Sequence, residues 1–437
     1  MPPEVVPADC LFLGIDIGTS GVRGCVIDAQ GEELASHRIE LEAPHIQGAC
    51  IEQDALIWKQ TTDNIIKALT NQVNADYREK SIAALAIDGT SGTVLACDEL
   101  GAPLSFALMY NDARCTAEAA RIAAIAPADC GAHGTSASLA KALFLLEQHP
   151  EARHICHQAD WIAATLTGHY GFSDENNCLK LGYNSLEETW PNWLNQLGVA
   201  RQVLPDVVKP GSRLANISAE AADELGLPES CEIIAGTTDS IAAFIATGAN
   251  TTGDAVTSLG STLVLKIITH RPVFAPELGI YSHRFGEHWL AGGASNSGGS
   301  VLKQHFSQSQ LDAMTPRLNP QQPTGLHYYP LPASGERFPR CDPGLKPQLE
   351  PRPEDDLSFF QAILEGIADI EAEGYQQLAK LGAPAPQRVF TAGGGSRNPA
   401  WQQIRERTLN TPVIIVEHSE ASYGSALLAR QGFIQTQ

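Results

Sequence analysis

The chain has 437 residues, of which 43% are hydrophobic and 18% charged, so it is long enough for two or three globular domains. Its formal net charge is −21 at pH 7. That excess of acid disfavours a protein that binds nucleic acid or an anionic membrane, because both kinds of surface require basic patches.

The first ten residues, MPPEVVPADC, contain neither an Arg-rich amphipathic stretch nor the apolar core of a secretion signal. No apolar run reaches the roughly 18 residues of a membrane span. The 10 cysteines are scattered and form no Cys-x-x-Cys pair, which is typical of reduced thiols and unlike a disulfide framework or a zinc site. We therefore expect a cytoplasmic protein.

Residues 12–28, FLGIDIGTSGVRGCVID, place a Gly-Thr-Ser-Gly turn between two β-type apolar runs and predict strand–turn–strand. The stretch lacks the lysine of a Walker A loop, and the strand-like VRGCVID that follows is unlike the helix of a dinucleotide fingerprint. The backbone N–H groups of such a turn, with the hydroxyls of Thr19 and Ser20, bind anions. Asp16 beside them suggests a bridging Mg²⁺. A glycine-rich hairpin with a solvent-exposed acid is the alternative interpretation.

A strand is expected at 82–87 and another at 231–235. The second strand runs into Gly-Thr-Thr-Asp, and Asp239 stands just before an apolar helix. Thr238 or Asp239 could serve as the N-cap of that helix. Asp239 could equally be a general base at a strand end, since phosphoryl transfer needs only an ordinary carboxylate to orient a hydroxyl. The sequence leaves both interpretations open.

Residues 255–268, AVTSLGSTLVLKII, repeat the strand–turn–strand pattern about 240 residues after the first turn. The repetition predicts two α/β domains with a boundary in the small, polar stretch 246–255. Residues 290–299, LAGGASNSGG, form a further loop of small residues. The ten prolines of 316–353 predict an extended but ordered segment, and 357–381 carry a helical apolar stripe.

Residues 388–420 combine a strand, the glycines 393–395, a helix start at Asn398 and Pro399, and a second strand. This is nearly a dinucleotide-binding unit, which makes an NAD-dependent dehydrogenase the alternative from another functional class. The glycine spacing is poor for that motif, and a dehydrogenase gives the two hairpin turns no role. A loop of three glycines equally suits an adenine ring lying against bare backbone.

Taken in order, these motifs resemble the FGGY family of carbohydrate kinases. The resemblance rests on DIGTSG at 16–21, GTTD at 236–239, SLGST at 258–262, SGERFP at 334–339, AGGGSRNPAWQQ at 392–403 and ASYGSALLA at 421–429, and it spans essentially the whole chain. Within the family, IDGTSGTVL, AGTTDSIAAF and GLHYYPLPASGERFP look closest to a short cyanobacterial and plant branch described as D-ribulose kinases, also called xylulose-kinase-like.

The resemblance implies an α/β fold of two actin-like (ribonuclease-H-like) domains with mixed five-stranded sheets and flanking helices around a central cleft. The sugar-binding domain would be 10–247 and the nucleotide-binding domain 248–437. The implied reaction transfers the γ-phosphate of Mg-ATP to a primary hydroxyl of a ketopentose, D-ribulose first, with D-xylulose or another sugar or polyol as the alternative. A non-catalytic sugar and nucleotide sensor on the same fold is a further alternative.

The resemblance also assigns roles to residues. Asp239 matches the catalytic base, and Asp16 matches the catalytic acid residue that holds Mg²⁺. The positions that match ATP-binding segments are Gly18, Thr19, Ser20, Gly260, Ser261, Thr262, Gly293, Gly394, Gly395 and Asn398. The candidate sugar contacts are Ser20, Gly21, Ser91, Asp112 and Asp239.

Two stretches depart from the family pattern. In YNDAR, 110–114, Tyr110 stands where the family has Trp, and Asp112 with Arg114 could equally form a surface ion pair. The stretch SDENNCLKLGYN, 173–184, differs from the family's Asp-x-Ser-x-Ala-Ser. Both departures bear on which sugar is bound.

Overall fold

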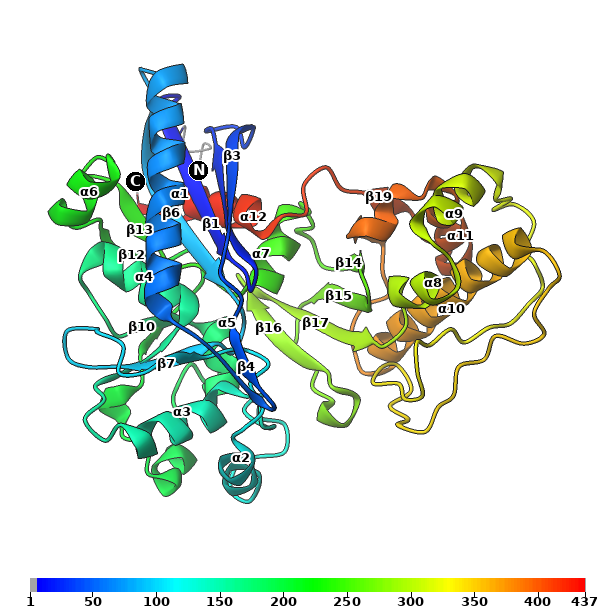
Figure 1. The fold of residues 1–437 in the computed structure, drawn as a ribbon, viewed down its shortest axis with the longest axis horizontal. Helices are drawn as coiled ribbons and strands as arrows, with labels where there is room; N and C mark the ends of the chain where they lie inside the picture. Colours follow the sequence, from blue (N-terminus) through cyan, green and yellow to red (C-terminus); the bar gives the residue numbers. More distant parts are fainter. Residues whose placement is uncertain (1–5, 437) are drawn as a thin grey trace. The chain divides into compact units, whose positions relative to one another are not determined.

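The protein, seen in a computed structural model that describes residues 6–436, contains two compact α/β units (Figure 1). Unit 1 comprises the chain up to Ala246 together with the residues from Glu420 onward, and unit 2 is Thr247–Ser419. The first five residues of the N-terminal segment considered above lie outside the described part. No helix within residues 6–436 is long and apolar enough to cross a membrane.

Unit 1 is built on a six-stranded mixed sheet in the order β12-β13-β6-β1-β2-β3. The central strand β1 pairs antiparallel with β2 and parallel with β6, so the predicted hairpin at 12–28 is confirmed. The predicted strands at 82–87 and 231–235 are β6 and β13. The bounds are β1 Cys10–Ile17, β2 Gly21–Ile27, β3 Glu33–Glu40, β6 Ser81–Gly89, β12 Arg213–Asn216 and β13 Glu232–Ile234.

Helices cover both faces of this sheet, because β1 alternates its side chains between two apolar cores. Leu11, Leu13 and Ile15 face the core that includes α1 (Ala55–Asp76), α4 (Gln158–Thr167) and α6 (Ala219–Leu225). Phe12 faces the other core, with Ala426 and Ala429 of α12 (Ala421–Thr436). Gly14 lets α12 approach, since a Cβ there would lie 2.0 Å from Ser422 O. Helix α7 (Asp239–Ala246) packs beside α12.

A smaller five-stranded sheet and its own apolar core complete unit 1. Its strands, in spatial order, are β4 His45–Gln47, β5 Cys50–Gln53, β8 Ala107–Leu108, β7 Val94–Cys97 and β9 His154–His157. The remaining elements of the unit are α2 Thr116–Ala123, α3 Ser138–Gln148, β10 Phe172–Asp174, α5 Glu175–Cys178, η1 Leu179–Leu181, η2 Asn192–Leu197, η3 Arg201–Val203 and β11 Asp206–Val208.

Unit 2 has a second six-stranded mixed sheet in the order β16-β17-β15-β14-β18-β19. Strands β14 and β15 confirm the second predicted hairpin, and α10 is the predicted helix at 357–381. The bounds are β14 Asp254–Leu259, β15 Leu263–Thr269, η4 Pro276–Leu278, β16 Tyr281–Phe285, β17 His288–Ser295, α8 Gly299–His305, α9 Gln308–Met314, η5 Thr315–Arg317, α10 Asp356–Lys380, β18 Arg388–Ala392, η6 Gly394–Arg397, α11 Pro399–Leu409 and β19 Val413–Ile415.

Beyond the end of η5, the proline-rich segment 316–353 has no helix and only isolated β-bridges, and it is ordered. Tyr328, Tyr329, Leu331 and Phe338 are buried in the core of unit 2. These apolar side chains fix a segment whose prolines cannot join a helix or a central strand.

The structure corrects the expected number of strands and adds a detail to the expected domain division. Each large sheet has six strands where five were expected, because β12 and β16 add antiparallel edge strands to β13 and β17. The sequence placed the residues from Glu420 onward in the second domain, 248–437, whereas in space they pack with unit 1. Helix α12 buries its apolar face against β1 and β6 and therefore belongs to unit 1.

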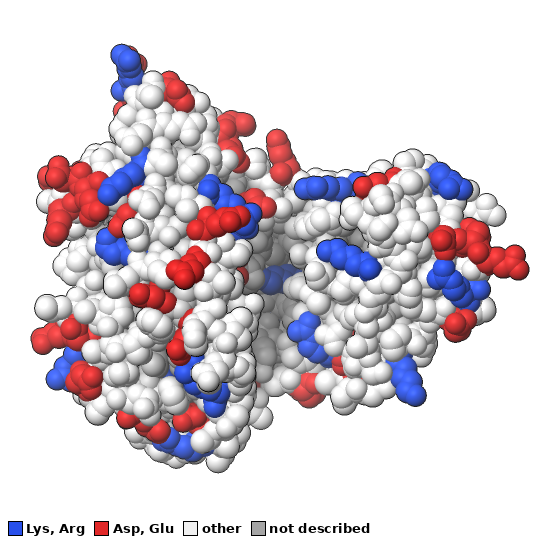
Figure 2. All heavy atoms as spheres, viewed as in Figure 1, with Lys and Arg blue, Asp and Glu red and all other residues white. Residues whose placement is uncertain are grey.

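Charged side chains of both signs are scattered over the visible surface. On the face drawn in Figure 2, Asp and Glu lie interspersed with Lys and Arg, although the sequence has 50 acidic and 29 basic residues.

Candidate active site

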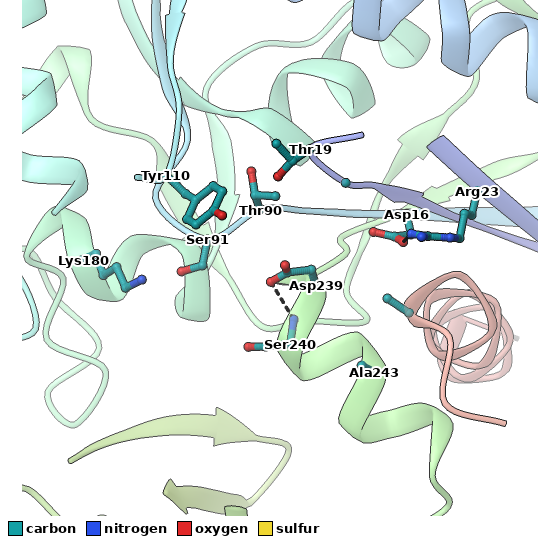
Figure 3. Close-up of a pocket in the computed structure, with 12 residues that line it drawn as sticks. Asp16, Thr19, Arg23, Thr90, Ser91, Tyr110, Lys180, Asp239, Ser240 and Ala243 are labelled. Carbon is teal, nitrogen blue, oxygen red and sulfur yellow. Dashed lines mark hydrogen bonds and ion pairs between the residues drawn. The ribbon is translucent and has the colours of Figure 1, made fainter. Parts of the chain in front are cut away.

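A cavity of about 480 Å³ opens in unit 1, where the carboxyl ends of β1 and β6 meet the start of α7 (Figure 3). Parallel strands present their carboxyl ends at the same edge of a sheet, and in α/β folds ligands bind at that edge. The lining residues are Asp16, Gly18, Thr19, Arg23, Thr90, Ser91, Tyr110, Lys180, Asp239, Ser240, Ala243 and Ala421.

Asp16 lies at the end of β1, beside the completely buried Asp88 of β6, its register partner. Burial, followed by the charge of Asp16, raises the pKa of Asp88 well above its usual range. Burial also raises the pKa of Asp16, against the lowering effects of its hydrogen bond with Asp88 and of Arg23. Of the two carboxyls, Asp88 has its pKa raised further. Ser425 Oγ of α12 donates to Asp88 Oδ2 at 2.6 Å.

Arg23 neutralises the acid that faces the cavity. Its Nη1 donates to Asp16 Oδ2 at 2.9 Å, and its Nε lies 3.6 Å from Glu420 Oε2. The Asp16 side chain is almost completely buried, so this ion pair is less screened than a surface pair. The guanidinium holds the carboxylate in a fixed orientation beside the first hairpin turn.

Asp239 is the first residue of α7 and lines the cavity. Gly236 brings its segment against β6, because a Cβ there would lie 1.6 Å from Ile87 O. Thr238 forms an isolated parallel bridge with Gly89 at the end of β6. Asp239 Oδ1 accepts a hydrogen bond from Ser240 N at 2.7 Å (Figure 3). The carboxylate thus stands both at a helix start and in a cavity, so the two sequence interpretations are compatible.

The first hairpin turn contributes only part of its predicted contacts. Gly18 and Thr19 line the cavity, and Gly18 N donates to Gly21 O at 3.0 Å. Ser20 and Gly21 do not line it. Ser20 is exposed, and Gly21 lets β3 approach, since a Cβ there would lie 2.9 Å from Ile39 O.

Ser91 and Tyr110 form one wall of the cavity on two loops that buried polar groups hold in place. Gln158 Oε1 accepts hydrogen bonds from Thr90 N at 3.0 Å and from Thr90 Oγ1 at 2.8 Å. Thr93 Oγ1 accepts a hydrogen bond from Tyr110 N at 2.9 Å. These bonds join the loop that carries Ser91 to the segment that carries Tyr110.

Lys141 reinforces the same junction from the core of unit 1. Its completely buried ammonium donates to Gly92 O at 2.8 Å and to Met109 O at 2.6 Å. Burial lowers the pKa of Lys141 to about 7. The wall is thus preorganised largely by side chains that do not line the cavity, namely those of Thr93, Lys141 and Gln158.

Asp112, a predicted sugar contact, does not line the cavity. Its carboxylate is completely buried, accepts from Ile51 N at 2.6 Å and pairs with Arg114 Nη2 at 2.7 Å. Arg114 also pairs with Glu52 at 2.8 Å. Asp112 and Arg114 therefore tie β5 to the segment that follows Tyr110, as a buried pair rather than the surface pair considered above.

A second cavity, of about 760 Å³, lies within unit 2. Five of the predicted nucleotide residues line it: Gly260, Ser261, Gly394, Gly395 and Asn398. Asn398 also caps α11, accepting from Trp401 N at 3.0 Å. The predictions missed other residues that line this cavity, among them Lys303, Gln308, Asp312, Phe360, Arg397 and Trp401.

Thr262 and Gly293 were predicted to bind ATP but do not line this cavity. Gly293 lies in the middle of β17, where a Cβ would come within 2.7 Å of the Phe338 ring. A glycine is needed at position 293 because the Phe338 ring packs against it. A stretch of small residues in the sequence does not show whether they serve packing or ligand binding.

A buried ion pair stands behind the second cavity. Arg405 of α11 and Glu371 of α10 are joined by bonds of 2.6 and 2.7 Å, and both side chains are almost inaccessible. Thr257 of β14 donates to Glu371 at 2.5 Å, and Thr391 of β18 accepts from Arg405 at 2.7 Å. The network therefore fixes both strands that lead into the loops of this cavity.

Asp16 is the residue that could hold a magnesium ion bound together with ATP. In the described part of the chain, no group of three or more His, Cys, Asp or Glu side chains could hold a metal. Kinase Mg²⁺ needs only one or two carboxylates, because phosphates and waters supply its other ligands. Asp16 offers one such carboxylate beside the Gly18–Thr19 turn.

The sequence signalled two further site residues only indirectly. Asp88 immediately precedes the GTSGT loop, but only the pairing of β1 with β6 places it beside Asp16. Lys180 lies in SDENNCLKLGYN, the stretch that departs from the expected pattern, and lines the cavity of unit 1.

Comparisons with known proteins agree with this arrangement. Residues 11–246 match the N-terminal domain of the FGGY family of carbohydrate kinases, and residues 255–431 match its C-terminal domain. Xylulose kinases of Staphylococcus epidermidis and Escherichia coli K12 are each 24% identical. They cover 97% and 90% of this chain, which in turn covers 88% and 84% of their lengths.

Solved structures show the same fold. A structure described as a xyloylose kinase from Brucella ovis aligns with a TM-score of 0.86 at 24% identity, covering 98% of this chain and 91% of that one. A Plasmodium falciparum glycerol kinase with ADP aligns with a TM-score of 0.85 at 19% identity, covering 97% and 90%.

Proposed function

Because the chain belongs to the FGGY family of carbohydrate kinases and is therefore an ATP-dependent phosphotransferase, we propose that it phosphorylates a ketopentose on a primary hydroxyl, with D-ribulose the first candidate. The observation that carries the proposal is the cavity of unit 1, which brings Asp239, Asp16 and the Gly18–Thr19 turn together with Ser91. Because the chain belongs to this family, residues 388–420 are not interpreted as the cofactor-binding unit of an NAD-dependent dehydrogenase.

Asp239 is the proposed base. Its carboxylate would orient the sugar hydroxyl and accept the proton as the hydroxyl oxygen bonds to the γ-phosphorus of ATP. The bond between that phosphorus and the β–γ bridging oxygen breaks, and ADP leaves. Asp239 is suited to this role because it lines the cavity at the start of α7, where the Ser240 N–H fixes its carboxylate.

The backbone of the first hairpin turn would place fixed hydrogen-bond donors beside the transferred group. Preorganised donors of this kind lower the barrier because they need no reorganisation when charge develops. Mg²⁺ bound with ATP would be held by Asp16 and would neutralise phosphate charge. Arg23 and Asp88 oppose the rise in the pKa of Asp16 that burial causes, and Arg23 holds the Asp16 carboxylate in a fixed orientation.

ATP is proposed to bind in the cavity of unit 2. Gly394 leaves open space, with no heavy atom within 4 Å of an added Cβ, so a flat base could lie against the backbone there. Gly260 and Ser261 line the same cavity at the second hairpin turn. Lys303 and Arg397 add positive charge to it, which suits a polyphosphate.

D-ribulose is supported by the sequence stretches that resemble the short D-ribulose kinase branch, and D-xylulose is the second candidate. The observation that favours D-xylulose is that the curated relatives at 24% identity are xylulose kinases. Epimers differ only in where hydroxyls meet hydrogen-bonding groups, so turnover has to decide between them.

The test is ADP release from Mg-ATP with D-ribulose, D-xylulose, L-ribulose, glycerol or no sugar, for the wild type and for Asp239→Ala. We expect turnover with one ketopentose and a loss of at least about 10³-fold in the variant. Thermal unfolding with ATP checks that the variant still folds and binds nucleotide. ADP release that is the same with and without sugar would instead identify an ATPase or a sensor.

A further inference from the structure

Lys180 is the one cationic side chain that enters the cavity of unit 1 without a partner among residues 6–436. Its ammonium makes no hydrogen bond or ion pair there, whereas Arg23, the other cation that lines the cavity, is paired with Asp16. Figure 3 shows the ammonium pointing into the cavity on the side of Ser91. Burial lowers the pKa of Lys180, while the charge of Asp239 raises it.

The local fold directs this lysine into the cavity. Leu179 and Leu181, its neighbours in η1, are buried in the core, so the side chain between them points the other way. Gly182 then ends η1 with φ of 99°, a left-handed conformation that favours glycine. The stretch LKLG thus presents a single long cation to the site.

The segment that carries Lys180 is also tied to the segment that carries Asp239. Asn176 Nδ2 donates to Thr237 Oγ1 at 3.0 Å, and Thr237 Oγ1 lies 3.2 Å from Asp174 Oδ2. Asn177 Nδ2 donates to Asp174 Oδ1 at 2.6 Å. These buried bonds explain three polar residues of SDENN, Asp174, Asn176 and Asn177, and they hold the segment of Lys180 against the segment of the proposed base.

The Lys180 side chain is partly exposed and its ammonium faces the cavity. A ligand that fills the cavity displaces water from this ammonium and has to supply an acceptor in its place, because desolvating a charge is costly. We infer that Lys180 contacts the substrate and donates a hydrogen bond to the C2 carbonyl oxygen of an open-chain 2-ketopentose. This inference rests on the proposed function and makes it more specific.

Sugar chemistry supports the carbonyl as the acceptor. The furanose form of a 2-ketopentose closes its ring by bonding the C5 oxygen to C2. This inference takes the C5 hydroxyl, and not the other primary hydroxyl on C1, as the acceptor. Phosphoryl transfer to the C5 hydroxyl requires the open-chain form, which exposes a carbonyl at C2. A carbonyl oxygen only accepts hydrogen bonds and an ammonium only donates them, so the two groups complement each other. Asp239 would take the C5 hydroxyl proton.

The experiment compares Lys180→Met with the wild type on D-ribulose, on ribitol, whose C2 carries a hydroxyl, and on D-ribonate, whose C1 is a carboxylate. Lys180→Met keeps the length of the side chain and removes the charge. Lys180→Arg keeps the charge, and Lys346→Met, an exposed lysine of unit 2, is the matched control.

We expect Lys180→Met to raise the KM for D-ribulose by about 10- to 100-fold, the range for a hydrogen bond to a charged group. kcat and the KM for ATP should change less than about threefold, and the preference for D-ribulose over ribitol should shrink. Lys180→Arg should restore part of the loss, and Lys346→Met should behave as the wild type.

Each contrary result has its own meaning. A KM for D-ribulose that changes less than about threefold in Lys180→Met, or equal losses on D-ribulose and ribitol, would overturn the carbonyl contact and leave the kinase proposal intact. Wild-type turnover of D-ribonate in preference to every ketose would assign Lys180 to a carboxylate instead. Absence of sugar-dependent ADP release by the wild type would overturn the proposed function and this inference with it.

Discussion

Among single residues, Asp174 shows most clearly how the fold controls protonation near the cavity. It is completely buried and accepts hydrogen bonds from Asn176 N at 2.9 Å and Asn177 N at 3.3 Å. Burial, followed by the charge of Asp160, nevertheless raises its pKa to about 7. The hydrogen bonds oppose that shift without cancelling it.

This shift predicts a pH-dependent stability. Between about pH 4, where the unfolded carboxyl ionises, and about pH 7, the native state binds the additional proton. The contribution of Asp174 to stability is therefore lost as pH rises through that window. Asp174→Asn does not titrate, so its free energy of unfolding relative to wild type should increase by roughly 2–3 kcal/mol from pH 5 to pH 7. Urea titrations at pH 5, 6, 7 and 8 measure it, and a constant difference would contradict the shift.

Much of the site could be predicted from residue types in motifs, and the failures have a common cause. Asp16, Ser91 and Asp239 line one cavity, and Gly394 and Asn398 line the other. Gly293 and Asp112 are motif-like residues whose surroundings are purely structural. The sequence does not show that Phe338 covers Gly293 or that Ile51 N reaches Asp112, because those contacts join distant parts of the chain.

At the scale of elements, α10 carries two glutamates that differ only in their surroundings. Glu371 pairs with Arg405 in the core of unit 2, whereas Glu373 pairs with Arg340 at the surface at 2.9 Å. The side chains of the first pair are 0–1% exposed, and those of the second are 37–42% exposed. The two pairs therefore provide a matched comparison on one helix.

Glu371→Gln should destabilise unit 2 by about 3 kcal/mol or more, because it leaves the buried guanidinium of Arg405 without a charge partner. Glu373→Gln should cost less than about 1 kcal/mol, since solvent screens the exposed pair. Chemical denaturation of both variants, followed by circular dichroism, gives the two values. Equal losses would show that burial does not determine the importance of these pairs.

Element types were predictable where a periodic pattern is strong. The two hairpins and α10 follow directly from alternating and helical apolar patterns. The edge strands β12 and β16 were not expected, because one or both faces of an edge strand are solvated and its pattern is weak. Their pairing depends on neighbours that only the folded sheet supplies.

At the scale of the whole molecule, unit 1 is discontinuous in sequence and unit 2 is continuous. Unit 2 has its own sheet and its own core within Thr247–Ser419. Unit 1 lacks one covering helix until α12 is added, since Phe12, Ala84 and Ile234 pack against that helix. The sequence did not predict that the chain returns to unit 1 after unit 2, because no obvious linker separates α12 from unit 2.

These differences predict how fragments behave. A fragment of residues 247–419 should unfold cooperatively and bind ATP, whereas residues 6–246 should lack a cooperative transition. Residues 6–246 with 420–436 joined by a flexible linker should regain it. Thermal unfolding by calorimetry distinguishes these outcomes. A cooperative transition in residues 6–246 alone would show that α12 is dispensable for the fold of unit 1.

Helix α12 also links the site to the order of protein synthesis. It supplies Ala421 to the cavity and Ser425 to Asp88, yet a ribosome translates it only after all of unit 2. At 5–20 residues per second that delay is roughly 10–35 s. During this delay, one apolar face of β1 and β6 is not covered by α12, and Asp88 lacks the hydrogen bond from Ser425. A nascent chain that ends within unit 2 can therefore form the sheet of unit 1 but not the complete cavity. The cavity of unit 1 is completed only after the ribosome has translated all of unit 2.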